Sequence, residues 1–424
     1  MAYYKRVADK LLKEKLEAKG AILVTGAKWC GKTSTSLRIA KSTLFMQDPQ
    51  TKKQNIAIAE LNPMLLLEGD VPRLIDEWQI APQLWDAVRF EVDKRNEFSQ
   101  FILTGSATPV KVLDNSHTGL GRIGRLKMRP MSLFESLDSN GSVSLCELFM
   151  NREIMIQGTC DLELDDLAFL ICRGGWPRSI GYSERIALQQ AIDYFEGLIE
   201  TDISKVDGVH RNPERAKRLL RSLARFVGSQ AKLSSILEDM KSNESSTISD
   251  KTIRTYIEAL NNIFVLENSV SWNPQLRSKT AVRTSDTRYF TDPSIATAAL
   301  GVGPKDLIND LETMGFLFEN MCIRDLRIYS EILNGSVYHY RDKSNLECDA
   351  VIHLRNGSYA LIEIKLGGHK LIELGASNLN KLENVIDTSK MKKPAFKMII
   401  VGVGKYAYQR KDGIYIVPIG CLKP

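Results

Sequence analysis

Residues 26–33 of this chain read Gly26-Ala27-Lys28-Trp29-Cys30-Gly31-Lys32-Thr33. The stretch fits the pattern G-x-x-x-x-G-K-[ST], in which the glycines let backbone N–H groups wrap around phosphate oxygens. An apolar run, Ala21 to Thr25, precedes it, and helical character begins at Ser34. A strand before the loop and a helix after it are the context that this mechanism needs, because the helix N-terminus also favours anions. The stretch therefore predicts a nucleotide-binding P-loop inside an α/β fold.

The predicted loop gives its polar residues definite roles. Lys32 is expected to reach the β- and γ-phosphates of ATP and to act in catalysis, and the Thr33 hydroxyl is expected to ligate Mg²⁺. The residues expected to contact the nucleotide are Gly26, Ala27, Lys28, Trp29, Cys30, Gly31, Lys32, Thr33 and Ser34.

A second acidic motif completes the predicted site. Leu74-Ile75 leads directly into Asp76-Glu77. We expect Asp76 to hold Mg²⁺ through water and Glu77 to polarise the attacking water as a general base. The alternative is an exposed acidic turn, because Pro72 and Arg73 interrupt the run before it.

A third predicted strand, Phe101 to Thr104, places a hydroxyl near the expected γ-phosphate. Ser106 is the preferred catalytic sensor, and Thr104 is the alternative. Further along, Arg122 or Arg125 could neutralise transition-state charge, in the same chain or from a neighbouring subunit. The alternative is that both are solvated surface arginines with no role in catalysis.

The pattern between residues 21 and 140 alternates strands with helices. A helix from Ser34 to Leu44, a strand at Ile56–Ala59 and a helix from Leu84 to Lys94 are expected. Such alternation indicates a parallel sheet that binds ligands at the carboxyl ends of its strands.

Length and composition set wider limits. A chain of 424 residues indicates two or three domains. Lys plus Arg is 57 and Asp plus Glu is 51, a formal net charge of +6 that permits an anionic partner without requiring one. No apolar run approaches the roughly 18–20 residues of a membrane span. The seven cysteines include no C-x-x-C pair, so a cytoplasmic protein with reduced thiols and no membrane contact is expected.

Several motifs, taken in order, resemble one family, the prokaryotic AAA-type ATPases fused to a C-terminal domain of unknown function. The motifs are Gly20 to Thr33, Arg73 to Gln79, Phe101 to Ala107, Gly121-Arg122, Met128 to Glu135, Arg173-Gly174-Gly175-Trp176-Pro177 and Glu363-Ile364-Lys365. The resemblance covers nearly the whole chain. It implies a P-loop ATPase module, a winged-helix-like middle and a C-terminal end with a restriction-endonuclease-like fold.

One predicted helix in the middle of the chain is a candidate DNA-recognition helix. Between Asp250 and Leu260, residues 253, 257 and 260 are apolar, whereas Lys251, Arg254 and Thr255 fall on the other face. A polar turn precedes it and Phe264-Val265-Leu266 follows, as in a recognition helix with its wing. The helix could equally pack against protein.

The C-terminal end carries a carboxylate pattern. Glu363 and Lys365 lie two apart on a predicted strand and so share a face. Asp349 lies on the preceding strand and Glu319 on the helix before it. Asp349 and Glu363, with Glu319 and Lys365, match a nuclease-like metal site, in which Mg²⁺ activates water against a phosphodiester. The alternative is a retained fold whose acidic residues only form salt bridges.

The sequence thus predicts an α/β protein with a P-loop ATPase domain (1–140), a helical linker (141–212), a winged-helix-like domain (213–300) and an endonuclease-like domain (301–424). The expected function is Mg²⁺-dependent ATP hydrolysis coupled to DNA or another nucleic acid. Two alternatives stay open: a nucleotide-gated signalling switch that docks a protein partner, and an ATP-regulated metal-dependent nuclease. A homo-oligomer is compatible with each.

Overall fold

The computed structural model describes residues 3–105, 119–151, 154–205, 209–241, 249–274, 285–389 and 391–424. The chain forms two compact units, each built from separate segments. Unit 1 comprises Met1–Pro130, Glu200–Arg211 and Ile257–Phe264. Unit 2 comprises Met131–Ile199, Asn212–Tyr256 and Val265–Pro424.

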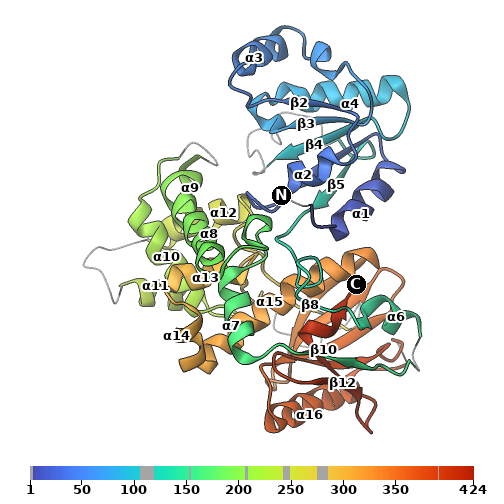
Figure 1. Cartoon of the computed structure of the whole chain (residues 1–424), viewed down its shortest axis with the longest axis vertical. Coiled ribbons are helices and arrows are strands. Elements are labelled where there is room, and N and C mark those ends of the chain that lie inside the picture. The colour runs from blue at the N-terminus through green and yellow to red at the C-terminus, as the bar shows by residue number, and fades with distance from the viewer. Residues whose placement is uncertain are drawn as a thin grey trace. The chain divides into compact units, whose positions relative to one another are not determined.

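Unit 1 is built on a five-stranded sheet whose strands all pair in parallel, in the order β2-β3-β4-β1-β5 (Figure 1). The strands are β1 (Ala21–Thr25), β2 (Ser42–Phe45), β3 (Arg73–Asp76), β4 (Phe101–Gly105) and β5 (Ile123–Lys127). Because β4 lies between β1 and β3, the carboxyl ends of these three strands meet at one edge. The parallel sheet predicted from the alternating pattern is confirmed.

The helices of unit 1 supply the other half of its core. They are α1 (Val7–Leu16), α2 (Lys32–Leu37), α3 (Lys52–Leu61), α4 (Gln83–Arg95) and α9 (Ile203–Lys205), with 3-10 turns at Pro63–Leu67 and Trp78–Ile80. The core joins strand residues such as Ile75 and Leu103 to Trp85 and Val88 of α4. The sheet is therefore held rigidly beneath the loops that follow its strands.

Two predicted elements of unit 1 are wrong. The helix expected from Ser34 to Leu44 ends at Leu37, and its last residues belong to β2. The strand expected at Ile56–Ala59 lies inside α3. In that helix Asn55 and Ala59, four residues apart, are the buried positions, which is a helical period. The short Ile-Ala alternation resembles a strand only when the flanking residues are ignored.

The first part of unit 2 is mainly helical, as expected for residues after 140. Its helices are α6 (Leu145–Met150), α7 (Leu164–Arg173), α8 (Glu184–Gly197), α10 (Pro213–Arg225), α11 (Leu233–Lys241), α13 (Pro293–Leu300), α14 (Pro304–Asn309) and α15 (Leu311–Ile332). A π-helical turn, Leu198–Asp202, follows α8, and α12 (Asp250–Asn262) runs from unit 2 into unit 1.

The second part of unit 2 is an α/β domain around a seven-stranded mixed sheet, in the order β7-β12-β13-β11-β10-β9-β8. In Figure 1 the strands from β8 onward are orange to red, and β7 comes from the green part of the chain. The strands are β7 (Gly158–Thr159), β8 (Gly335–Arg341), β9 (Glu347–Leu354), β10 (Tyr359–Lys365), β11 (Lys397–Val401), β12 (Tyr406–Gln409) and β13 (Tyr415–Pro418). α16 (His369–Val385) packs on it through Ala376, Leu379 and Leu382. A separate pair joins β6 (Val143–Ser144) to β14 (Leu422–Lys423). The strands predicted to carry Asp349 and Glu363 are confirmed as β9 and β10.

In unit 2 the motifs Met128 to Glu135 and Arg173 to Pro177 meet at a buried junction. The Met131 N–H donates to the Gly175 carbonyl (2.6 Å), and the Gly175 N–H donates to Asp292 (2.9 Å). Arg324 bridges Asp292 (2.7 Å) and Asp325 (2.8 Å), and all three side chains are almost fully buried. Segments that start near residues 131, 173 and 292 are thus fastened at one point.

Within the described ranges, no helix has both the length and the apolar character needed to cross a membrane.

Candidate nucleotide site and a second carboxylate cluster

The loop between β1 and α2 needs glycine at both ends. Gly26 has φ +147° and Gly31 has φ +102°, values that side-chain-bearing residues rarely adopt. A Cβ on Gly26 would also lie 2.1 Å from the Met128 carbonyl oxygen. The loop is therefore pressed against the segment after β5, which fixes its curvature.

Lys32 opens α2 and bends back over the loop. Its Nζ donates to the carbonyl oxygens of Gly26 (2.9 Å) and Ala27 (2.8 Å), and the side chain is buried. The ammonium therefore lies within the curve of the loop, where a P-loop lysine meets phosphate oxygens.

Asp76, at the end of β3, collects two hydroxyl donors. Its Oδ1 accepts from Thr33 Oγ1 (2.7 Å) and from Thr104 Oγ1 (2.6 Å), and the residue is 2% exposed. The predicted pair Thr33 and Asp76 thus meets in space. A hydroxyl and a carboxylate at this distance are hard oxygen donors that fit Mg²⁺. Thr104, expected as the alternative sensor, donates to Asp76, and its role as a sensor stays a prediction.

Glu77 stands in the left-handed backbone region with φ 55°, a conformation uncommon for a residue with a side chain. Burial raises the pKa of its carboxyl; Lys32 lowers the pKa, Asp76 raises it, and a hydrogen bond from Gln79 lowers it. Gln79 Nε2 donates to Glu77 Oε2 at 2.5 Å. Sequence reasoning missed Gln79 because nothing in its spacing marks an amide as the partner of a base.

The end of β4 is tightly packed against the same turn. A Cβ on Gly105 would lie 2.7 Å from Gln79 Oε1 and 3.3 Å from Trp78 Nε1. These two buried polar atoms have no hydrogen-bond partner among the described residues. Ser106, the expected sensor, directly follows and lies outside the described residues.

The candidate arginine fingers lie on or beside β5. Arg122 precedes the strand and pairs with Asp93 through Nε (2.5 Å), with both side chains more than two-fifths exposed. Since β5 runs parallel to β1, Arg122 lies at the amino end of the sheet, opposite the P-loop edge. Arg125 is exposed in the middle of β5. The structure therefore does not bring either arginine to the loop of its own chain.

Two segments outside the motifs support the loop, and no motif marks either of them. Before α1, Arg6 donates to the carbonyl of Cys30 (2.7 Å) and to that of Arg129 (2.8 Å). Far along the chain, Asp202 pairs with Lys28 at 2.5 Å. That aspartate ends the π-helical turn, and such turns occur often at functional sites.

The four C-terminal residues also converge. Lys365 Nζ lies 2.9 Å from Asp349 Oδ2 and 2.6 Å from Glu363 Oε2. Asp349 Oδ2 also accepts from the Ile364 N–H (2.7 Å), and Tyr289 donates to Glu319. Burial, followed by repulsion from Asp349, raises the pKa of both Glu319 and Glu363 to about 8. This is a compact group of three carboxylates around one ammonium.

Glu363 is 1% exposed, and its Oε1 has no hydrogen-bond partner among the described residues. A buried carboxylate oxygen left without a donor is costly, and a cation would satisfy it. As the side chains stand, no set of three His, Cys, Asp or Glu residues in the described ranges is arranged to hold a metal ion.

The candidate recognition helix is present as α12. Ile253 and Leu260 are buried, whereas Lys251, Arg254 and Thr255 are exposed. After it, isolated antiparallel bridges join Leu266 to Phe290 and Ser269 to Thr287. The division into apolar and polar faces is as expected, and the winged-helix arrangement stays a prediction.

Comparison with known families agrees with the site. Residues 18–137 match the model of an AAA domain. Residues 164–306 and 314–422 match two domains of unknown function, DUF8612 and DUF4143. Together with the parallel sheet and the loop geometry, the first match defines the class: the chain contains a P-loop ATPase domain of the AAA type, a class that binds and hydrolyses ATP.

Two mycobacterial proteins are similar over most of the chain. They are uncharacterized protein Mb2031c of Mycobacterium bovis and uncharacterized protein Rv2008c of Mycobacterium tuberculosis. Each is 23% identical over 371 residues, which cover 86% of this chain and 74% of the relative.

Among solved structures, the Walker-type ATPase PABY2304 of Pyrococcus abyssi is 16% identical, with a TM-score of 0.43. The match covers 70% of this chain and 96% of that one. The Aeropyrum pernix ORC1 protein in complex with DNA is 15% identical, with a TM-score of 0.25, over 73% of this chain and 95% of that one.

Proposed function

We propose that this protein hydrolyses ATP in a Mg²⁺-dependent reaction that is coupled to nucleic acid. The observation that carries the proposal is the meeting of Thr33, Asp76 and Thr104 beside a glycine loop that already holds the Lys32 ammonium. Asp76 ends β3, Thr104 lies on β4, and Thr33 lies on α2 after the loop that follows β1, so the three side chains meet at one edge of the sheet, as a phosphate site requires.

Each residue has a task in this proposal. Lys32 exchanges its loop carbonyls for phosphate oxygens and neutralises their charge. Glu77, held by Gln79, orients the attacking water and takes its proton. Thr33 and Asp76 would hold Mg²⁺, which neutralises charge on the β- and γ-phosphates when bound.

The coupling to nucleic acid is supported by the exposed polar face of α12, which carries Lys251 and Arg254. Lys28 offers a link to the rest of the chain, because its partner Asp202 belongs to a segment that returns to unit 1 after α8. Phosphates that attract Lys28 would compete with Asp202.

ATP turnover with and without single- and double-stranded DNA tests the proposal. Lys32→Ala should abolish nucleotide binding or turnover. Glu77→Gln should keep binding but lower kcat by about 100-fold or more. Lys53→Ala, an exposed lysine on α3, is the matched control and should behave as the parent.

Parent-rate hydrolysis by Glu77→Gln would remove Glu77 as the base. Turnover that ignores DNA, or tight ATP binding without turnover, would instead support the signalling switch and a protein partner.

A second candidate function rests on the cluster of Glu319, Asp349, Glu363 and Lys365. Its convergence supports a restriction-endonuclease-like domain that binds a divalent cation and cleaves a phosphodiester, with ATP as regulator. Lys365 now lies between two carboxylates, so a cation would enter by moving it aside.

Thermal unfolding with Mn²⁺ and no nucleotide tests this cation site. Mn²⁺ should raise the melting temperature of the parent and of Lys32→Ala, but not of Asp349→Asn. Because the raised pKa values of Glu319 and Glu363 keep them partly protonated at neutral pH, the Mn²⁺ effect should grow as pH rises from 7 to 9. Equal shifts in all three proteins would place the cation elsewhere.

A further inference from the structure

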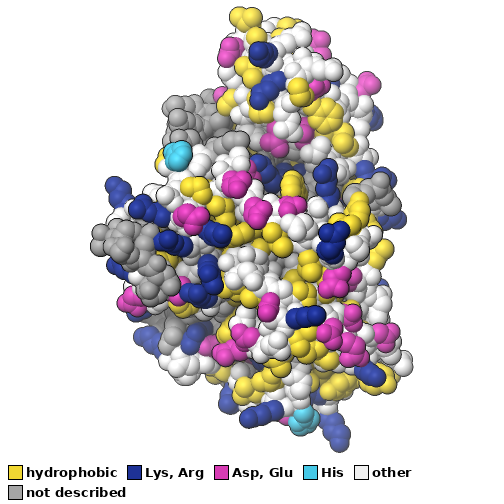
Figure 2. Space-filling model, turned by 60° about the vertical axis from the view of Figure 1, so that its left-hand side comes forward, with side chains coloured by type: hydrophobic (Ala, Val, Ile, Leu, Met, Phe, Trp, Pro, Cys, Tyr) yellow, Lys and Arg dark blue, Asp and Glu magenta, His cyan; other side chains and the backbone are white. Residues whose placement is uncertain are grey.

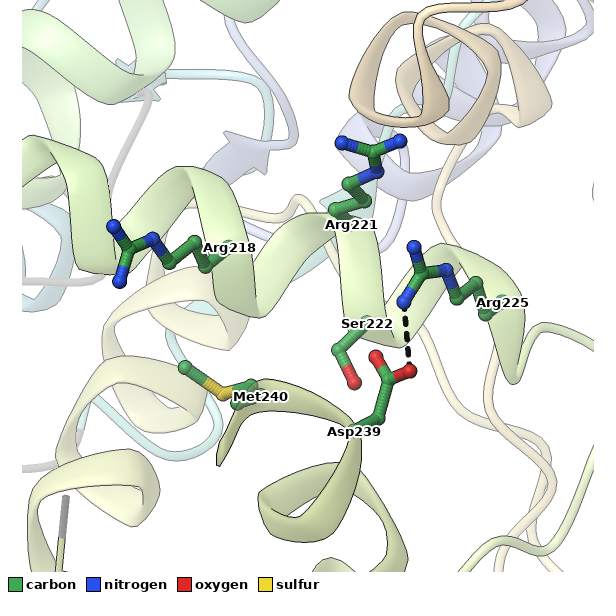
Figure 3. A pocket seen from close by; sticks show the side chains of 6 residues that line it. All are labelled: Arg218, Arg221, Ser222, Arg225, Asp239 and Met240. Atoms are coloured by element: carbon green, nitrogen blue, oxygen red, sulfur yellow. Dashed lines mark hydrogen bonds and ion pairs between the residues drawn. The ribbon is translucent and has the colours of Figure 1, made fainter. Parts of the chain in front are cut away.

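A pocket of about 240 Å³ opens between α10 and α11, apart from both sites described above. α10 contributes Arg218, Arg221, Ser222 and Arg225, and α11 contributes Asp239 and Met240 (Figure 3). Three guanidinium groups against one carboxylate leave an excess of positive charge at its rim. A small pocket lined in this way is suited to an anion with several oxygens.

The arginines form one stripe along α10. Positions 218, 221 and 225 are three and four residues apart, so they share a helix face. The helix as a whole carries five basic residues and a single acidic one, Glu214. Lys and Arg side chains also gather towards the left edge of the face drawn in Figure 2.

The three arginines are held differently. Arg225 Nη1 pairs with Asp239 Oδ1 at 2.7 Å, which fixes its guanidinium beside the pocket. Ser222 is buried and donates to the Ile236 carbonyl (3.3 Å), tying α10 to α11. Arg221 is exposed and has no ion-pair partner among the described residues. In the stripe, Arg225 is therefore held by its ion pair, and Arg221 is available to a ligand.

The start of α10 is also hydrogen-bonded to the candidate recognition helix, α12. The Tyr256 hydroxyl of α12 accepts a hydrogen bond from the N–H of Asn212, the residue that caps α10 (3.0 Å).

We propose that the α10–α11 pocket, with the stripe Arg218, Arg221 and Arg225, binds successive phosphates of a nucleic-acid strand. The inference rests on the proposed coupling to nucleic acid and names the surface responsible. Seven residues of helix span about 10 Å. One DNA strand carries a charge every ~3.4 Å along the helix axis, and its successive phosphates lie farther apart than this rise, so the stripe can reach more than one phosphate. Arginine suits this ligand because its planar donors engage phosphate in pairs.

The test is the salt dependence of binding to a short fluorescent oligonucleotide, followed by anisotropy between about 50 and 200 mM salt. Arg221→Ala should weaken binding several-fold and reduce the slope of log K against log salt by about 1. Arg218→Ala combined with Arg221→Ala should reduce it by about 2. Arg221→Lys should keep the slope, because it keeps the charge.

Arg355→Ala is the matched control, since Arg355 is an exposed arginine in the turn between β9 and β10. It should leave affinity and slope unchanged. If the parent binds the oligonucleotide and the Arg221 variants bind it with the parent's slope, the inference fails while the proposed coupling stands. If the parent does not bind at all, both fail. If Arg355→Ala reduced the slope as much as Arg221→Ala does, the pocket would also be overturned, because any surface charge would then suffice.

Discussion

At the scale of single residues, the chemistry of the nucleotide site depends on neighbours that hold the reacting groups. Asp76 is oriented by Thr33 and Thr104, and Glu77 by Gln79. The sequence motifs predict Asp76 and Glu77 as the reacting groups. Thr104 was the alternative to Ser106 as phosphate sensor, and its contact with buried Asp76 was not foreseen. The register of β3 against β4, which the sequence does not reveal, brings the two residues together.

Gln79 should influence the acid limb of the pH–rate profile of ATP hydrolysis. Glu77 acts as a base only when deprotonated, so its raised pKa places the acid limb of kcat above that of an ordinary glutamate, about 4.3. The hydrogen bond from Gln79 lowers this pKa. Gln79→Ala should therefore move the acid limb to higher pH, as measured by ATP turnover across pH.

The exposed residue at the start of α4 offers a comparison for this experiment. Gln83→Ala removes the same amide and should leave the limb where it is. An acid limb that stays at the parent's pH in Gln79→Ala would mean that Gln79 does not act through Glu77.

At the scale of elements, the sequence predicted types well and boundaries less well. β1, β4, α4, β9 and β10 were expected where they occur, because each has a run or period long enough to decide. α3 was mistaken because four residues of alternation cannot distinguish strand from helix. The group of Glu319, Asp349 and Glu363 was predicted, but the contact of Glu319 with Tyr289 was not.

Packing between elements makes a prediction for the junction at Gly175. A Cβ there would lie 2.0 Å from the Met131 carbonyl oxygen and 2.7 Å from its nitrogen, and backbone atoms cannot move aside cheaply. Gly175→Ala should therefore destabilise the protein by about 1–3 kcal/mol or more. The midpoint of urea unfolding measures this change.

Gly197, at the end of α8 in the same unit, provides the control. A Cβ on it would meet nothing within 4 Å. Gly197→Ala should be neutral or stabilise by up to about 1 kcal/mol through better helix propensity. Equal midpoints for the two variants would show that the Gly175 contact relaxes without cost.

At the scale of the whole molecule, the fold class was within reach of the sequence, and the threading of the chain was not. The glycine loop and the strand pattern predict a parallel sheet in the first domain and an α/β domain at the C-terminal end. Nothing local indicates that Glu200–Arg211 and Ile257–Phe264 return to unit 1. Such returns depend on long-range packing, in which Lys28 meets Asp202 across 174 residues.

That threading has a consequence for synthesis on the ribosome. Domains made of one segment can fold as soon as they emerge. Unit 1 cannot complete its packing until residue 264 has left the exit tunnel, and β6 waits longer still, because its partner β14 holds Leu422 and Lys423. For much of translation, the nascent protein therefore carries all five strands of the unit 1 sheet, while the last two segments of that unit are still to be made.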